Sequence, residues 1–201
     1  MNKTLLLLAG YPGTGKTYFA DMVIQQHPEF HLHSQDLIKE HFFDTYGFAN
    51  IDEKKAVVTK AREYYYQKME YYMQQGKSII SDYPFSYKQK PIFERLSVKY
   101  HYQVITVRFI GDIKIIYNRQ RNRDLDASRH VGHMASKYYK GDRQENRSSA
   151  GDLITFEKFL ARGKDRGYET FALGHVIDVD TSDFSKVDYE SILETIAKLV
   201  T

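Results

Sequence analysis

Short apolar runs alternate along the chain with longer segments in which apolar residues recur at helical spacing. Five runs are short enough to be buried strands, at residues 4–9, 30–33, 78–81, 104–109 and 176–179. Helices are expected to begin after Gly15, near Gln35, near Asp52, near Gln89, at Asp112 and at Lys186. Strands and helices that alternate in this way are typical of βαβ units. The pattern therefore predicts an α/β fold around a parallel sheet.

The longest helical pattern covers residues 52–75, which contain neither Gly nor Pro and are followed by Gly76. Gly is a frequent stop signal for helices, so one long helix is expected here. Its tyrosines, at positions 64–66 and 71–72, could stack nucleic-acid bases. We favour the alternative, in which the helix packs on the sheet and the tyrosine hydroxyls lie at its wet margin.

Residues 124–151 have the weakest periodicity in the chain and are rich in Ser, Arg and Lys. They belong to a basic region between Arg108 and Arg147, which either faces phosphates or forms a solvated helical surface. We expect a mobile helical lid at about residues 112–150.

Length and composition narrow the class of protein. The 201 residues suit a single domain, residues 1–201, with a sizeable core. The chain has no Cys, which excludes disulfides, thiolate zinc sites and cysteine nucleophiles. The apolar run at residues 5–8 ends too early for a signal peptide, and no run approaches the roughly 18 apolar residues of a membrane span. We therefore expect a soluble cytoplasmic protein, and its net charge of +3 suits polyanionic ligands.

Residues 10–17, GYPGTGKT, match the phosphate-loop motif G-x-x-x-x-G-K-[ST], and they stand between a predicted strand and a predicted helix. The glycines let backbone N–H groups turn toward phosphates, Lys16 reaches the terminal phosphates, and the Thr17 hydroxyl ligates Mg²⁺. The residues expected to bind the nucleotide are Gly10, Gly13, Thr14, Gly15, Lys16, Thr17 and Tyr18.

Asp82 closes the third predicted strand, beside the phosphate loop. A carboxylate at this position can hold Mg²⁺ together with Thr17, or it can serve as a turn or cap residue. We favour the metal role. The next residue is Tyr83, where many nucleotide hydrolases place a Glu that activates water, and this argues against a hydrolytic motor.

Asp36 follows the second predicted strand, at the sheet edge where α/β proteins bind ligands. Its carboxylate could accept the proton of an attacking hydroxyl, and Lys39 would lie on the same helical face and attract an anionic acceptor. The alternative is that Asp36, or Ser34 before it, caps the helix.

Arg119 and Arg123 are spaced i,i+4 on the helix that starts at Asp112, so they share one face. A closing helix with two aligned arginines could stabilise the charge of phosphoryl transfer, whereas a solvated basic helix is the plainer interpretation.

Two histidine pairs, His31 with His33 and His130 with His133, lack a third ligand at suitable spacing, so no metal site is expected there.

The guanine-reading motif Asn-Lys-x-Asp does not follow the fourth strand, which favours ATP as the nucleotide. Residues 178–185 could form the loop that contacts adenine, or a simple connection with turn chemistry.

Taken in this order, these motifs resemble the P-loop kinase group that includes polynucleotide kinases, zeta toxins and small predicted ATP-dependent kinases. The resemblance implies a P-loop NTPase fold, with a five-stranded parallel sheet of order 2-3-1-4-5 flanked by helices and a helical lid. It also implies that Asp36 is the general base, that Lys39 contacts the acceptor in place of the more usual Arg, and that Arg119 and Arg123 are the lid arginines. The stretch DYPFS looks like the Asp-Gly-Phe-Pro-Arg of adenylate kinases with Ser86 in place of the arginine, which disfavours a nucleoside monophosphate acceptor.

The sequence thus predicts an ATP- and Mg²⁺-dependent kinase that transfers the γ-phosphoryl to a hydroxyl acceptor. Lys16, Asp36, Arg119 and Arg123 are the expected catalytic residues, Lys39 the substrate-binding residue, and Thr17 and Asp82 the metal ligands. The acceptor is either a small molecule or a nucleic acid, in a pocket built from residues 37–50, 85–91 and 127–149. The alternative function is an ATP-binding regulatory protein without phosphoryl transfer.

Overall fold

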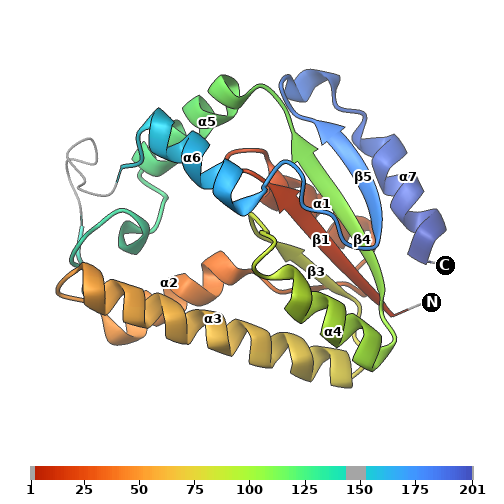
Figure 1. Cartoon of the computed structure of the whole chain (residues 1–201), viewed down its shortest axis with the longest axis horizontal. Coiled ribbons are helices and arrows are strands. Elements are labelled where there is room, and N and C mark those ends of the chain that lie inside the picture. The colour runs from red at the N-terminus through yellow and green to blue at the C-terminus, as the bar shows by residue number, and fades with distance from the viewer. Residues whose placement is uncertain (1–2, 144–152, 201) are drawn as a thin grey trace.

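The computed structural model describes residues 3–143 and 153–200 and contains a five-stranded sheet of order β2-β3-β1-β4-β5 (Figure 1). The neighbouring strands are paired in parallel. The strands are β1 (Thr4–Gly10), β2 (His31–Leu32), β3 (Ile79–Asp82), β4 (Gln103–Ile110) and β5 (His175–Asp180). This confirms the predicted α/β class and the strand order 2-3-1-4-5. Each predicted strand end lies within one residue of its observed position.

The helices are α1 (Lys16–Gln26), α2 (Gln35–Tyr46), α3 (Ile51–Gln74), α4 (Lys90–Tyr100), α5 (Ile113–Leu125), α6 (Phe156–Arg166) and α7 (Tyr189–Val200). The long helix α3 is confirmed, and the Asn50 side chain caps it by accepting from the N–H groups of Asp52 and Glu53. The predicted start at Asp112 is also confirmed, because its side chain caps α5.

Two helix predictions need correction. Helix α6 was not predicted, although Thr155 caps it and its apolar residues share one face; Gly163 in its interior lowers helix propensity. Helix α7 starts at Tyr189 rather than near Lys186, because a 3₁₀ turn at Phe184–Lys186 precedes it.

The core lies on both faces of the sheet, because the side chains of a strand alternate between its faces. Leu6 and Leu8 of β1 are fully buried in a cluster with residues of α1 and α7. Leu5 and Leu7 are fully buried in a second cluster, which includes residues of α3 and α4. In Figure 1, α3 and α4 accordingly lie away from α7. Because these helices cover the two faces of the sheet, a site can form at the carboxyl ends of the strands.

The tyrosines of α3 mainly support packing. Tyr65 is fully buried and exchanges a hydrogen bond of 2.8 Å with the Ser81 hydroxyl, so its own hydroxyl lies inside the core rather than at a wet margin. Tyr64 and Tyr71 are exposed.

The predicted lid includes α5, a 3₁₀ helix at Val131–His133 and the following loop as far as residue 143. Its remaining part, residues 144–150 with Arg147, lies outside the described residues, and its mobility stays a prediction. A β-bridge between Phe48 and Tyr138 joins the lid to the end of α2. No helix within residues 3–143 and 153–200 is long and apolar enough to cross a membrane.

Helix α6 packs directly on the phosphate loop. The Tyr11 ring is buried, with its centroid 4.9 Å from that of Phe159 and 5.3 Å from that of Tyr168. A Cβ atom at Gly163 would lie 1.9 Å from the Tyr11 hydroxyl oxygen. Gly163 therefore permits the close approach of α6 to the loop, although it weakens the helix locally.

We expect Gly163→Ala to lower the free energy of unfolding by about 1–3 kcal/mol, the usual cost of overpacking. Helix propensity alone predicts the opposite sign, a gain of about 1 kcal/mol. Urea denaturation measures the difference. In a Tyr11→Ala background the same substitution should no longer destabilise, and an equal loss in both backgrounds would contradict this explanation.

Candidate active site

The phosphate loop connects β1 to α1, and its three glycines have positive φ values, which other residues rarely adopt. Gly15, the N-cap of α1, has a φ of 84°, and Gly13 has a φ of 89°. A Cβ atom at Gly13 would also lie 2.8 Å from the Ile116 carbonyl oxygen of α5. The loop is therefore formed as the motif predicts, with its N–H groups at the N-terminus of a helix, where anions bind.

Lys16 lies inside this loop and is buried. Its Nζ donates to the carbonyl oxygens of Gly10 at 3.1 Å and Tyr11 at 2.5 Å, and to the Thr14 hydroxyl at 3.2 Å. Burial, together with the nearby charge of Arg123, lowers the pKa of Lys16 to about 7. An anion that enters the loop would reverse this shift by favouring the charged amine.

Thr17 and Asp82 lie side by side at the start of α1 and the end of β3. The Thr17 hydroxyl donates to Asp82 Oδ2 at 2.8 Å, while Asp82 Oδ1 is buried without a hydrogen-bond partner among the described residues. Burial raises the pKa of Asp82, and the charge of Asp36 raises it further. A hydroxyl and a carboxylate whose second oxygen has no hydrogen-bond partner among the described residues form the hard oxygen donor set that Mg²⁺ prefers.

Asp36 occupies the first turn of α2, and its carboxylate faces the cavity rather than the backbone. It accepts from Lys39 Nζ at 2.6 Å and forms an ion pair with Arg129 at 3.4 Å. Burial raises its pKa, but the charges of Lys39, His133 and Arg129 outweigh this and hold the pKa below its usual value. Ser34 takes the N-cap position without a side-chain capping bond. The Asp36 carboxylate is thus ionised and directed into the cavity.

The two predicted lid arginines have different surroundings. Arg119 donates to the carbonyl oxygens of Thr181 and Ser182, and its guanidinium lies 3.8 Å from the centroid of the Phe184 ring. Arg123 is half-buried beside Lys16, and its Nε has no hydrogen-bond partner among the described residues. Burial and the charge of Arg129 lower the pKa of Arg123. Arg119 thus holds the loop after β5, while Arg123 faces the cavity.

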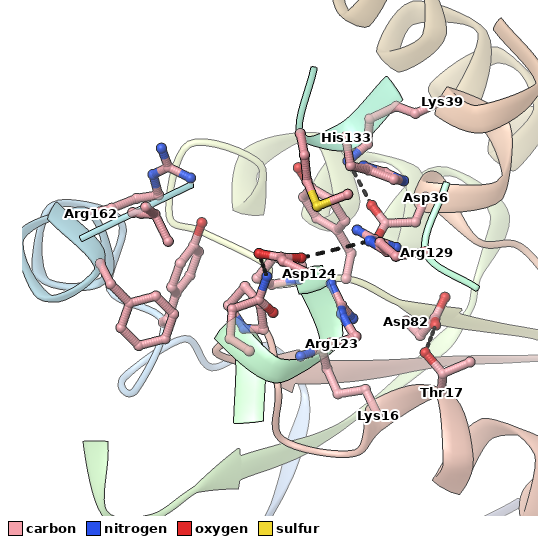
Figure 2. Close-up of a pocket in the computed structure, with 18 of the residues that line it drawn as sticks. Lys16, Thr17, Asp36, Lys39, Asp82, Arg123, Asp124, Arg129, His133 and Arg162 are labelled. Carbon is pink, nitrogen blue, oxygen red and sulfur yellow. Dashed lines mark hydrogen bonds and ion pairs between the residues drawn. The ribbon is translucent and has the colours of Figure 1, made fainter. Parts of the chain in front are cut away.

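One cavity of about 210 Å³ brings most of these residues together (Figure 2). Lys16, Thr17, Asp36, Lys39, Asp82 and Arg123 line it; Arg119 lines a neighbouring pocket with Gly15 and Tyr18. Of the segments predicted to build the acceptor pocket, 37–50 and 127–143 contribute to the cavity wall, whereas 85–91 does not. Residues 144–149 lie outside the described residues.

Sequence reasoning missed several residues of this wall. Arg129 of the lid lies 3.5 Å from Glu40 and 3.8 Å from Asp124, in addition to its pair with Asp36. His133 Nε2 lies 2.8 Å from Glu40 Oε1, and burial lowers the pKa of His133 to about 4. Helix α6 adds Phe159, Arg162 and Arg166. The basic composition of 108–147 was the available signal for Arg129. The available signals for α6 were the cap at Thr155, the apolar spacing of Phe156, Phe159 and Leu160, and the stop at Gly167.

The four histidines considered as metal ligands have other partners. His33 stacks on the Tyr65 ring, and His31 lies against Tyr72. His130 Nε2 lies 3.1 Å from Asp44.

A family model described as an AAA domain matches residues 5–140 of the chain. The chain belongs to this AAA-domain family. The AAA-domain segment contains the phosphate loop, Asp36, Asp82, Arg119 and Arg123, whereas α6 lies beyond it. No curated protein matches the chain.

Solved structures show that this AAA-domain protein has a P-loop kinase fold. A proposed kinase from Chloroflexus aurantiacus J-10-fl superposes with a TM-score of 0.76 at 22% identity, covering 98% of each chain. A gluconokinase from Sinorhizobium meliloti 1021 matches with a TM-score of 0.57 at 8% identity, covering 98% of this chain and 94% of its own. A shikimate kinase from Bacteroides thetaiotaomicron matches with a TM-score of 0.56 at 13% identity, covering 98% and 97%. At these identities the structures show the P-loop kinase fold alone and do not assign a group within that class.

Proposed function

We propose that this AAA-domain protein is an ATP- and Mg²⁺-dependent kinase that transfers the γ-phosphoryl of ATP to a hydroxyl acceptor. The observation that carries the proposal is that Lys16 and Asp36 line the same cavity. Lys16 lies on the side of the cavity that is formed by the phosphate loop. Asp36 lies on the other side, and its carboxylate does not cap the backbone of α2. A nucleotide site alone would not need such a carboxylate.

The adenine of ATP has a suitable pocket next to the phosphate loop. Gly15, Tyr18, Phe184 and Tyr189 line it, and Arg119 stacks on the Phe184 ring beside it. Flat apolar side chains suit a base, and the pocket is continuous with the loop through Gly15. We infer that Arg119 positions the adenine loop, residues 178–185, and that Tyr18 contacts the nucleoside.

The Mg²⁺ ion of the nucleotide fits the Thr17–Asp82 pair, because the buried Oδ1 of Asp82 lacks a partner among the described residues. When bound, the ion would supply positive charge that offsets the negative charge of the nucleotide phosphates. Thr17 and Asp82 would hold it, with the Asp82 carboxylate fixed by the Thr17 hydroxyl.

The transfer itself would use Asp36. Its carboxylate accepts the proton of the acceptor hydroxyl as the oxygen attacks the γ-phosphorus; one P–O bond forms to the acceptor and the P–O bond to ADP breaks. Lys16 and Arg123 donate to the oxygens of the transferring group, where charge accumulates. Lys39 and Arg129 hold the Asp36 carboxylate in place.

We propose a small-molecule acceptor, with a nucleic-acid 5′-hydroxyl as the second candidate. Two neighbours with this fold are named for small acceptors, gluconate and shikimate. The cavity is also walled by α6 and the lid segment, which suits a compact ligand.

Assays of Mg²⁺-dependent ADP formation with panels of small hydroxyl compounds and oligonucleotides test the choice of acceptor. ATP that binds stoichiometrically without acceptor-stimulated ADP release would favour the regulatory protein instead.

Binding of ATP should take up a proton at alkaline pH. The pKa of Lys16 is lowered to about 7 in the free protein, so the amine loses its charge as the pH rises above that value. Phosphates in the loop raise this pKa again, and near pH 8 binding should take up as much as about one proton. Calorimetry in buffers of different ionisation enthalpy measures the uptake. A Lys16→Met variant provides the control, and equal proton uptake in both proteins would refute the assignment.

A further inference from the structure

Helix α6 lies beyond the matched AAA-domain segment, yet it forms one wall of the active-site cavity. Arg162 and Arg166 of α6 both line the cavity, and their i,i+4 spacing places them on the same helical face. Figure 2 shows Arg162 on the far side of the cavity from Asp36 and Lys39. A ligand between these groups would contact both sides.

The wall of the active-site cavity carries more basic than acidic side chains. The basic residues are Lys16, Lys39, Arg123, Arg129, Arg162 and Arg166, and the acidic residues are Asp36, Asp82 and Asp124. Asp36 is already paired with Lys39 and Arg129, and Arg129 also lies near Asp124. Lys16 and Arg123 flank the phosphate loop and are used by the ATP phosphates. The two arginines of α6 are therefore the cations left for another ligand.

Neither arginine of α6 has a carboxylate partner among the described residues. The Arg166 guanidinium donates to the Tyr168 hydroxyl at 3.2 Å, which orients it without neutralising it. Arg162 is exposed at the cavity. Paired guanidinium groups are suited to phosphate or carboxylate groups, because their N–H donors match the oxygens of both.

The position of these arginines is fixed relative to the phosphate loop. The Tyr11 ring packs against Phe159 and Tyr168, and it lies so close to Gly163 that a Cβ atom there would overlap it. The Arg166 carbonyl oxygen also accepts from the Tyr87 N–H at 3.3 Å. Helix α6 therefore presents a preformed pair of cations to a ligand that lies beside the γ-phosphate.

We propose that Arg162 and Arg166 form an anion subsite for the acceptor. The acceptor is then a small molecule with a phosphate or carboxylate group at one end, held by α6, and a hydroxyl at the other end, next to Asp36. Between the two ends it would contact the apolar wall, which includes Ile154, Phe159 and Met134. This inference rests on the proposed kinase function, because it assigns the remaining part of the same cavity.

Inorganic phosphate serves as the probe, with the protein first saturated with Mg²⁺ and the non-hydrolysable ATP analogue AMP-PNP. The analogue fills the γ-phosphate position, so phosphate can reach only the remaining subsite. Phosphorus NMR follows the titration, and competition by acetate shows whether a carboxylate is also accepted. We expect saturable phosphate binding, weakened at least about ten-fold in an Arg162→Gln/Arg166→Gln variant, with AMP-PNP binding unchanged.

Lys164→Gln is the matched control, since it removes one exposed charge from the same helix without altering the cavity wall. It should bind phosphate like the unmodified protein. The single variant Arg162→Gln changes an exposed side chain and should weaken binding by itself, which guards against misfolding of the double variant. If AMP-PNP binds but phosphate does not, or if the double variant binds phosphate as tightly as the control, the subsite is wrong while the proposed function stands. If AMP-PNP itself does not bind, both are wrong.

Discussion

Replacing Asp36 with asparagine is expected to lower kcat by about 10²–10⁴-fold, the usual contribution of a general base. The amide cannot accept the acceptor proton, whereas the phosphate loop and the Thr17–Asp82 pair are left intact. The KM for ATP should therefore change little. Initial rates of ADP formation with a saturating hydroxyl acceptor measure the effect.

The control for this substitution is Asp44→Asn on the same helix. Asp44 accepts from the Tyr138 hydroxyl at 2.5 Å and lies 3.1 Å from His130, so it holds the same lid segment but does not line the cavity. Its loss should change kcat far less than the loss of Asp36. Equal effects of the two variants would mean that Asp36 acts only by docking the lid. Normal turnover in Asp36→Asn would remove the base assignment altogether.

Replacing Lys16 with methionine is expected to lower kcat by about 10²–10³-fold, the size of effect seen when one charge-stabilising donor is removed. The thioether fills much of the space of the buried amine but cannot donate to phosphate oxygens. Affinity for ATP should also fall, because the phosphates lose the buried ammonium group of the phosphate loop. Calorimetric titration with ATP and steady-state kinetics separate the two effects.

Lys114→Met provides the comparison for Lys16, since Lys114 is an exposed lysine of α5 that lies outside the cavity lining. It should bind and turn over ATP normally. The Lys16 variant should keep its circular dichroism spectrum and unfold cooperatively. Unchanged ATP turnover in a folded Lys16→Met protein would contradict the assignment of the phosphate loop.

Much of the fold was predictable because its signals are local. The strands are short, apolar and bounded by polar residues, and in β1 the residues Leu5–Leu8 are buried on both faces of the sheet. The stop at Gly76 and the cap at Asp112 are also encoded within a few residues. Helix α6 was missed although its signals are also local: Thr155 caps it, Phe159 and Leu160 share one face, and Gly167 ends it. Its contact with Tyr11 could not be read from the sequence, because it depends on the fold.

The candidate site was predictable to a similar degree. The phosphate loop is a contiguous motif, and Asp36 and Asp82 follow strands whose carboxyl ends meet at one sheet edge, so the strand order brings them to one cavity. The partners of Asp36 were harder to find. Arg129 reaches it from 93 positions away in a segment without clear periodicity. Spacing along one helix also could not show that Arg119 and Arg123 would have different neighbours.

The measurement that tests the central claim most directly is the fate of the γ-phosphoryl group. The protein is incubated with Mg²⁺, ATP that carries a radioactive γ-phosphate, and fractionated small metabolites, with Asp36→Asn and Lys16→Met as controls. We predict that the label moves to an organic phosphate monoester, and that both variants strongly reduce this transfer. Label that stays in ATP, or that appears only as inorganic phosphate, would contradict the assignment of this protein as a kinase with a hydroxyl acceptor.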